Sequence, residues 1–435
     1  MSASPASSPA PAPEAATSTP GTDTGTPTTS STAHQIRLAV AIVLGNLLWI
    51  APFIAGISVL LPARLEVVAP DDKVAVIATL AMAGSLVALL ANIVFGALSD
   101  RTRSRFGRRT PWMLLGSLVT ALALVGLSRT SSVAGIILLW CVFQFFLNAI
   151  VAPLVAVIPD RVPERRRGTF SAVYGVGATV GAGVAGVVAS RYVADPTTGL
   201  LVFAVAALLA GPAVALIAPD RSNLHEPKPA FDRETLLRNF SFPRRGARDF
   251  YLALSGKLLF VLAMYAVTGY ELYILTDYFG LDTVGAGAMI ATIATIQTVG
   301  ALVAGSLSGP LSDRFDRRKG PVVAASLLLA VALAVPFFWQ SSTSMIVFAV
   351  LGLGLAFGVF NAVDQALNYR VLPDRETAAK DLGILNMANT GGQILGPVVM
   401  SIAVTSLGGY RAGFIVSAGI AVLSAAIVAM IRSTR

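Results

Sequence analysis

The sequence predicts an all-α membrane protein with twelve spanning helices, arranged as two six-helix halves of similar structure. Three observations predict this class. Hydrophobic residues make up 55% of the 435 residues and charged residues only 13%, whereas a soluble domain carries roughly 25% charged residues. Long apolar runs recur along the whole chain. Two short motifs of the first half return in the second half.

Apolar runs long enough to cross a bilayer occur twelve times. A bilayer core about 30 Å thick is crossed by about 20 residues of helix. These runs are too long and too uniformly apolar for a β-barrel, whose strands alternate over about ten residues. The predicted spans are residues 38–62, 74–98, 111–128, 133–158, 168–193, 198–218, 250–276, 285–309, 320–340, 343–370, 382–407 and 410–431.

Positive charge is concentrated on one side of these spans. Of the 32 Lys and Arg residues, 26 lie in the amino-terminal segment, the loops after even-numbered spans and the carboxyl terminus; five lie in the opposite loops, and Lys257 lies inside a span. Loops rich in Lys and Arg remain cytoplasmic, so both termini are expected to be cytoplasmic. The net charge of +9 therefore reflects the positively charged loops on one side of a cell membrane. We expect a lipid bilayer, and no nucleic acid, as partner.

Cysteine and histidine usage argues against a metal or redox site. The single cysteine, Cys141, lies within the fourth predicted span, so neither an intramolecular disulfide nor a cysteine metal cluster is possible. Both histidines, His34 and His225, lie outside the spans, which excludes an intramembrane histidine relay. The spans hold no set of nucleophile, base and orienting group. We expect no enzymatic activity, no cofactor and no metal.

Polar segments divide the chain into four parts. Residues 1–35 are rich in Pro, Ser, Thr and Ala, which predicts a disordered cytoplasmic tail. Residues 219–249 form a polar linker between a six-helix bundle at 36–218 and a second bundle at 250–435. The linker separates the spans six and six.

The two bundles share sequence at matching positions. GALSDR at 96 returns as GPLSDR at 309, and VIPDR at 157 returns as VLPDR at 371, with offsets of 213 and 214 residues. Two matches at nearly one spacing, each in the same loop of its half, indicate a structural repeat. Transporters built from two such halves bind their substrate between them, near mid-membrane.

The first repeated motif belongs to a charged loop between the second and third predicted helices. Its characteristic residues are Gly96, Asp100, Arg101, Gly107, Arg108 and Arg109. This pattern resembles the loop motif of the major facilitator superfamily, G-x-x-x-D-R followed by G-R-R. The longer form found here, D-R-T-R-S-R-F-G-R-R-T-P-W, is similar to the glycoside, pentoside and hexuronide symporters and to the sucrose and proton symporters. The resemblance covers residues 38–431 and implies the fold of that superfamily.

A gating role for this loop follows from its composition and from the resemblance. Glycine permits the second and third helices to approach, while the arginines stay at the anionic membrane surface. The resemblance implies that Asp100 faces the start of the eleventh helix near Lys380 and Asp381, which would latch one side shut. Asp313 with Arg314 would act in the same way toward the fifth helix. The alternative is that these charges only fix the orientation of the chain.

Polar side chains inside the spans are the candidate solute ligands, since each is costly there unless it is paired or hydrated. Four residues of the tenth helix fall within an arc of about 100°, and in the superfamily's fold helices one, four, seven and ten line the cavity. We expect amide groups to bind solute and Trp49 to stack on a sugar ring. The alternative is packing and hydrogen bonding between helices. The predicted ligands are Asn46, Trp49, Gln144, Asn148, Asn361, Gln365 and Asn368, with Asn386, Asn389 and Gln393 forming a similar stripe on the eleventh helix.

Lys257 and Asp364 are embedded charges of opposite sign at matching depth in the seventh and tenth helices. An ion pair would lower the cost of burying either charge, and protonation of Asp364 would release the lysine. We therefore expect this pair to couple proton binding to rearrangement, the alternative being a purely structural pair. Glu271, near the far end of the seventh helix, is a weaker candidate.

The sequence therefore predicts a monomeric transporter that moves a small solute by alternating access. Proton-coupled symport of a sugar or polyol-like solute is the favoured function. Predicted helices two and four contain no Asp or Glu, which argues against a sodium site. A drug or metabolite exporter working as a proton antiporter on the same fold is the first alternative. A receptor or scaffold that moves no solute is the second.

Overall fold

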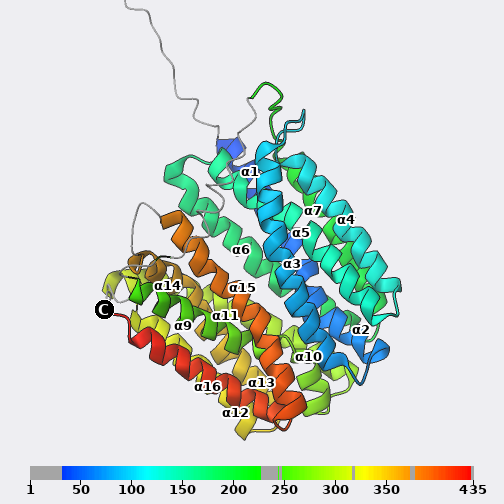
Figure 1. The fold of residues 1–435 in the computed structure, drawn as a ribbon, viewed down its shortest axis with the longest axis vertical. Coiled ribbons are helices and arrows are strands. Elements are labelled where there is room, and N and C mark those ends of the chain that lie inside the picture. The colour runs from blue at the N-terminus through cyan, green and yellow to red at the C-terminus, as the bar shows by residue number, and fades with distance from the viewer. Residues whose placement is uncertain (1–31, 227–242, 244–246, 316–318, 373–377, 433–435) are drawn as a thin grey trace, which may run out of the picture.

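The computed structural model describes residues 32–226, 243, 247–315, 319–372 and 378–432, with only the backbone described for residues 309–315, Gln365 and residues 378–379. Helices make up nearly all of this described part (Figure 1). The tail predicted to be disordered and the second copy of the VIPDR motif lie mostly outside it.

The first half contains six helical spans. Its first span is an α-helix that continues through a π-helical turn into a second short helix, and its fifth span ends in a 3-10 turn. The elements are α1 (Thr32–Ala55), η1 (Gly56–Leu60), α2 (Leu61–Val68), α3 (Lys73–Arg101), α4 (Thr110–Arg129), α5 (Val133–Arg161), α6 (Glu164–Ala189), η2 (Ser190–Tyr192) and α7 (Pro196–Ile217).

The second half repeats this order of spans. Its first span ends in a π-helical segment, and its fourth span is interrupted by one. The elements are α9 (Arg248–Thr268), α10 (Glu271–Tyr273), η3 (Ile274–Tyr278), α11 (Thr283–Phe315), α12 (Lys319–Phe338), α13 (Thr343–Phe348), η4 (Ala349–Ala356), α14 (Phe357–Arg370), α15 (Ala378–Ser406) and α16 (Tyr410–Ala429).

Eleven spans of the described residues are long and apolar enough to cross a membrane. The twelfth predicted span corresponds to α15, which is 29 residues long and falls outside this set. Amide side chains in its first half lower its hydropathy. Three of those amides, Asn386, Asn389 and Gln393, line a cavity between the halves. The all-α fold with twelve spans predicted from the sequence is confirmed within this difference.

The spans of each half pack mainly on one another, and the two halves meet along two seams. In the first half α4 packs on α5 and α7, and α1 packs on α6 and α7; in the second half α9 packs on α15 and α16. One seam joins α6 to α11, and the other joins α3 to α15. Figure 1 shows α15 running beside α3 between the two groups of helices. Any space enclosed between these seams is therefore built from both halves.

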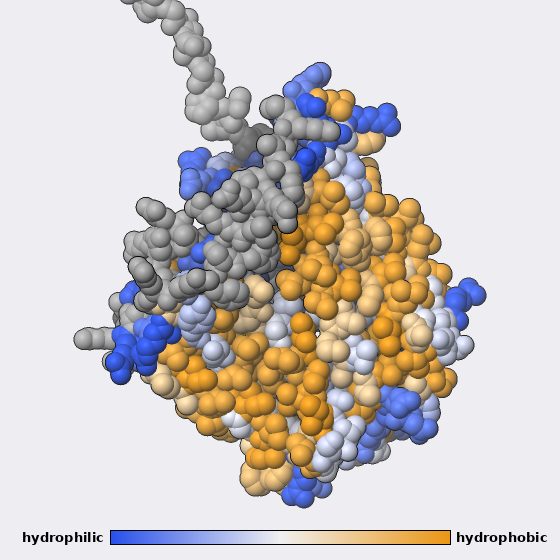
Figure 2. All heavy atoms as spheres, viewed as in Figure 1, coloured by the Kyte–Doolittle hydropathy of each residue, from blue (hydrophilic) through white to orange (hydrophobic). Residues whose placement is uncertain are grey.

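The outward surface is apolar along the middle of the molecule. Figure 2 shows apolar residues over the middle of one face and polar residues gathered at its two ends. Large side chains point outward from several helices, with Leu138 on α5, Leu216 on α7 and Leu307 on α11 all exposed. An apolar surface of this extent matches hydrocarbon rather than water. We call the end that carries residues 101–109 and 161–167 the arginine end, and the opposite end, where α3 begins, the Lys73 end.

The seventh span is broken in the structure, whereas the sequence predicts one continuous helix over residues 250–276. The structure ends α9 at Thr268 and restarts the helix at Glu271. Tyr270, between the two, has non-helical backbone angles of φ −120° and ψ 17°. Its hydroxyl donates to the carbonyl of Val74 in the first half, at 2.8 Å. The break thus turns the outer segment of this span toward the other half of the molecule.

Candidate functional site

A cavity of about 770 Å³ lies between the two halves. Residues of α1, α3, α5, α9 and α15 line it, so both halves contribute to its wall. It extends toward the arginine end, because its lining includes Asn92 on α3 and Lys380 in the first turn of α15. The polar and aromatic lining residues are Trp49, Phe53, Ser85, Asn92, Gln144, Asn148, Tyr265, Lys380, Asn386, Asn389, Thr390 and Gln393.

Three of the predicted ligands line this cavity together. Trp49 comes from α1, and Gln144 and Asn148 come from one face of α5. The Asn148 amide donates to the carbonyl of Gln144 at 2.9 Å, and the Asn92 amide donates to the Asn148 side-chain oxygen at 3.1 Å. These bonds orient Asn148, whereas the Gln144 side chain faces the cavity. The amide stripe of α15 lines the opposite wall, where the Asn389 amide donates to Asn386 at 2.8 Å.

Asn46 lies elsewhere, which corrects its expected place in the cavity wall. Its side chain is fully buried between α1 and α6, and its amide donates to the backbone carbonyl of Tyr174. The reason is the close approach of these helices at the glycines of α6. A Cβ added at Gly177 would lie 3.0 Å from the Val43 carbonyl oxygen, and one at Gly181 would lie 2.5 Å from Ile50. Backbone contact of this kind encloses Asn46.

The polar stripe of the tenth span divides between two environments, although we expected all of it to line one cavity. Asn361 is exposed to a smaller cavity of about 240 Å³. Asp364 and Asn368 are buried, at 5% and 2% exposure. Gln365 has a side chain outside the described part of the structure. The stripe turns away from the cavity because Asp364 and Asn368 face a cation on α9.

That cation is Lys257, which pairs with Asp364 as the charges in the sequence suggested. The Lys257 Nζ and Asp364 Oδ2 atoms lie 2.6 Å apart, with 3% and 6% of the side chains exposed. The Asn368 amide also donates to Asp364 Oδ2, at 2.9 Å. A buried carboxylate with a cation and an amide donor is well stabilised in its charged form. Neither charge lines either of the two cavities described above.

Trp140 and Tyr265 belong to the site and were missed by the sequence reasoning. Trp140 stacks on Phe143 with ring centroids 4.7 Å apart and lines a small cavity of about 40 Å³ beside Gln144. Tyr265 lines this cavity and both larger ones. Trp140 was detectable, since Trp140, Gln144 and Asn148 follow one another at four-residue spacing on one helical face. Tyr265 carried no comparable signal in an apolar stretch of α9.

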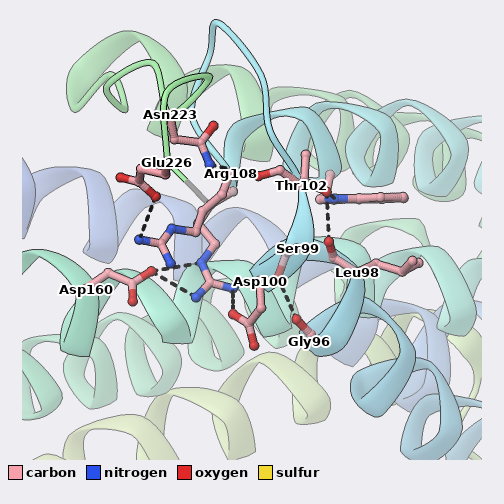
Figure 3. A network of polar contacts seen from close by, with 11 residues as sticks. Gly96, Leu98, Ser99, Asp100, Thr102, Arg108, Asp160, Asn223 and Glu226 are labelled. Carbon is pink, nitrogen blue, oxygen red and sulfur yellow. Dashed lines mark hydrogen bonds and ion pairs between the residues drawn. The ribbon is translucent and has the colours of Figure 1, made fainter. Parts of the chain in front are cut away.

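The arginine end holds the predicted gating motif in a dense polar network (Figure 3). Arg109 is buried, and its guanidinium lies 2.6 Å from Asp100 Oδ1 and 2.9 Å from Asp160 Oδ2. It also donates to Ser99 Oγ at 2.6 Å. Asp160 belongs to the VIPDR motif, so Arg109 joins the two repeated motifs of the first half. This network holds the ends of α3 and α5 together.

The start of the predicted linker docks onto the same loop. The Asn223 amide donates to the Thr102 carbonyl at 2.8 Å, and Arg108 pairs with Glu226 at 3.7 Å. Gly107 has φ +81°, and a Cβ there would lie 2.2 Å from the Asp220 carboxylate. Glycine is therefore required at 107 for both its backbone conformation and the close approach of Asp220.

Two expectations about the motif change. A Cβ at Gly96 would meet no atom within 4 Å, so the expectation that Gly96 brings the second and third helices together is wrong; α3 packs on α5 and α15 instead. Asp100 pairs with Arg109 of its own loop and is 58% exposed, rather than capping α15. The side chains of Asp313 and Arg314, in the second copy, lie outside the described part, and the gating role of the motif stays a prediction.

Contacts across the halves close the Lys73 end. The Lys73 ammonium lies 2.8 Å from Glu66 in its own half and 2.9 Å from Asp277 in the other half. The Tyr273 hydroxyl donates to the Pro62 carbonyl at 3.0 Å, again across the halves. Together with the Tyr270 bond, these contacts shut the cavity at this end. The large cavity therefore extends toward the arginine end and is blocked at the Lys73 end.

Comparisons with known proteins agree with this architecture. The family model described as Major Facilitator Superfamily matches residues 47–305 and 259–435. None of the curated proteins compared matches the chain.

Solved structures show the same fold at low sequence identity. A mutant of the nucleoside transporter NupG superposes with a TM-score of 0.73 at 14% identity, covering 91% of this chain and 100% of its own. A transporter of the POT family in complex with 5-aminolevulinic acid gives 0.71 at 12% identity, covering 90% and 95%. A bacterial homologue of the human lysosomal transporter Spinster, inward-facing and unoccupied, gives 0.69 at 15% identity, covering 92% and 97%.

Proposed function

The chain belongs to the major facilitator superfamily and is a transporter rather than an enzyme, and from this premise we propose that it moves a sugar or polyol-like solute together with a proton. Alternating access is the mechanism: the two halves rock about the central cavity, so that it reaches one side of the membrane at a time. The observation that carries the proposal is the amide-lined cavity between the halves, blocked at the Lys73 end.

The cavity wall supports a neutral, hydroxyl-rich solute. Amides donate and accept hydrogen bonds at once, as hydroxyl groups do, and the wall offers Gln144 on one side and Gln393 on the other. Trp49 lines the same cavity and could offer the face of its indole ring. Such a face suits the apolar side of a sugar ring. A drug exporter would favour a more apolar wall.

Lys257 and Asp364 are the proposed coupling pair. Protonation of Asp364 would remove the charge that holds the Lys257 ammonium at 2.6 Å, so the lysine would be released and α9 would be free to shift against α14. We propose that the arginine end faces the cytoplasm, because loops rich in Lys and Arg remain there, and that both termini lie on that side. We further propose a monomer in the cell membrane, with the Arg109 loop acting as a gate at the cytoplasmic side.

Uptake into proteoliposomes tests this function directly. An inward proton gradient is expected to accumulate one or more members of a panel of radiolabelled monosaccharides, disaccharides and polyols. Asp364→Asn is expected to abolish accumulation driven by the gradient. Expulsion of solute by the same gradient would indicate the proton antiporter instead, and movement of no solute would indicate the receptor or scaffold.

A matched pair of variants tests the cavity wall. Gln144→Leu removes a lining amide and is expected to weaken solute binding roughly tenfold, the equivalent of one hydrogen bond of about 1.4 kcal/mol. Asn46→Leu removes an amide of the same type from the α1 and α6 contact and should leave solute affinity unchanged. Equal effects of both variants on solute affinity would contradict the proposed wall.

A further inference from the structure

Glu271 is an acidic residue at the helix break of the seventh span, and the coupling pair makes no use of it. It begins α10, directly after Tyr270, and lines the smaller cavity of about 240 Å³. The wall of this cavity comes from α1, η1 and α6 of the first half and from α9, α11 and α14 of the second. Ile50, Ile54 and Tyr265 also line the large cavity, so the two spaces adjoin.

The Glu271 carboxylate lies in this cavity without a compensating charge. Its Oε1 atom is buried and has no hydrogen-bond partner. The described lining includes no Lys, Arg or His; its polar members are neutral, with Thr268, Gln297 and Asn361 among them. Asp364 is the contrast, since it has both the Lys257 ammonium and the Asn368 amide. Two buried carboxyl groups in one half therefore have opposite environments.

These environments favour opposite protonation states. An ionised carboxylate inside a membrane protein is strongly destabilised unless a cation or several donors compensate it. A protonated carboxyl carries no charge and can donate one hydrogen bond and accept others. Glu271 therefore favours the neutral form while the cavity has this shape, and it becomes an acid when a rearrangement brings water or a cation to it.

We propose that Glu271 is a second proton-binding site, which faces the solute path and is separate from the Lys257 and Asp364 pair. This rests on the proposed proton-coupled transport and adds a named carboxyl to it. When protonated, Glu271 can donate to a solute hydroxyl in the smaller cavity. When ionised, it would lack hydration in this cavity, so it would draw in water.

The position of Glu271 connects this proton to closure of the Lys73 end. Its two nearest aromatic neighbours in the chain, Tyr270 and Tyr273, donate to carbonyls of Val74 and Pro62 in the other half. Hydration of an ionised Glu271 between these two contacts would loosen the segment that carries both. Proton binding at Glu271 thus favours the closed Lys73 end, and proton release favours its opening.

Other titratable groups near α10 are occupied elsewhere. Three charged residues of the packed elements α2 and η3 lie outside the cavity wall: Arg64 donates to the Thr130 carbonyl, and Glu66 and Asp277 pair with Lys73. The remaining groups are phenols, namely Tyr265 on α9, Tyr270, Tyr273 on α10 and Tyr278 on η3.

Infrared difference spectroscopy of the purified protein in liposomes tests the site without any solute. Between about pH 5 and about pH 9, where buried carboxyl groups titrate, the wild-type protein is expected to lose the carbonyl band of a protonated carboxylic acid. Glu271→Gln should lack this band, whereas Asp364→Asn should retain it. Sodium added at constant pH should leave the band unchanged.

Persistence of the full band in Glu271→Gln would overturn the proposal, as would its absence from the wild-type protein or its removal by sodium. If Glu271→Gln does not fold, Glu271→Asp keeps the carboxyl and is expected to shift the band in frequency and in midpoint pH; an unshifted band would overturn the proposal. Because no solute is used, failure of every sugar in the uptake panel would leave this result standing.

Discussion

Removal of Lys257 is the sharpest test of the buried ion pair. Lys257→Met keeps the length of the side chain and deletes its charge, which leaves the Asp364 carboxylate with the Asn368 amide as its remaining donor among the contacts described. The two charged side chains are 3% and 6% exposed, so solvent does not screen them. Breaking a buried pair from one side costs about 3–5 kcal/mol, and we expect a loss of unfolding free energy in this range at neutral pH.

The loss should depend on pH with a defined sign. In Lys257→Met the folded protein retains a proton on Asp364 that the unfolded chain releases. Stability should therefore fall by about 1.4 kcal/mol for each pH unit of rise, over the range in which only the folded state holds this proton. Acidification is thus expected to rescue the variant.

Denaturant unfolding in detergent micelles, followed by tryptophan fluorescence, measures both effects. The double variant Lys257→Met with Asp364→Leu removes both charges and is expected to regain most of the lost stability, because replacement of a buried pair by apolar groups is often neutral. The reasoning would be refuted if the single variant lost less than about 1 kcal/mol, or if the double variant were no more stable than the single one.

Three further predictions concern the two ends of the molecule. Lys73→Gln removes an ion pair across the halves worth about 1–2 kcal/mol. A cysteine introduced at Ser58 in a cysteine-free background should therefore react about 5- to 30-fold faster with a membrane-impermeant thiol reagent added at the Lys73 end. An unchanged rate would contradict closure by this pair. Gly107→Ala forces a side chain to φ +81° and should cost at least about 1–2 kcal/mol in denaturant unfolding. Gly96→Ala adds a methyl group in open space inside α3 and should be neutral or stabilising by up to about 1 kcal/mol, because alanine favours a helix. Similar costs for the two variants would disprove the assignment. Arg109→Gln leaves Asp100 and Asp160 without their shared cation. Because Asp100 is 58% exposed and solvent screens it, the loss of unfolding free energy should be about 1–2 kcal/mol. A loss no larger than that of Arg108→Gln, which removes the exposed pair with Glu226, would contradict the central place of Arg109 in the network.

Much of the site was predictable only as residue types. Trp49, Gln144 and Asn148 were identified because polar or aromatic groups in an apolar span need a partner or a cavity, and they do line the cavity. The same reasoning selected Asn46, whose amide nitrogen instead donates to a backbone carbonyl of α6. Helical periodicity gives the face of the helix on which a residue lies. It does not show whether that face packs against another helix or lines a cavity.

The sequence by itself determined that the chain spans a membrane many times, that its halves repeat, and that Lys257 and Asp364 lie at one depth. These properties follow from local hydropathy and spacing along single helices. Only the tertiary structure decided that the Lys73 end is closed, that Arg109 joins two distant motifs, and that Glu271 lies in a cavity without a cation. Closure of the Lys73 end and the surroundings of Glu271 depend on which helices of the two halves meet, and that is set by packing between segments about 200 residues apart. The Arg109 network depends on packing among helices of the first half.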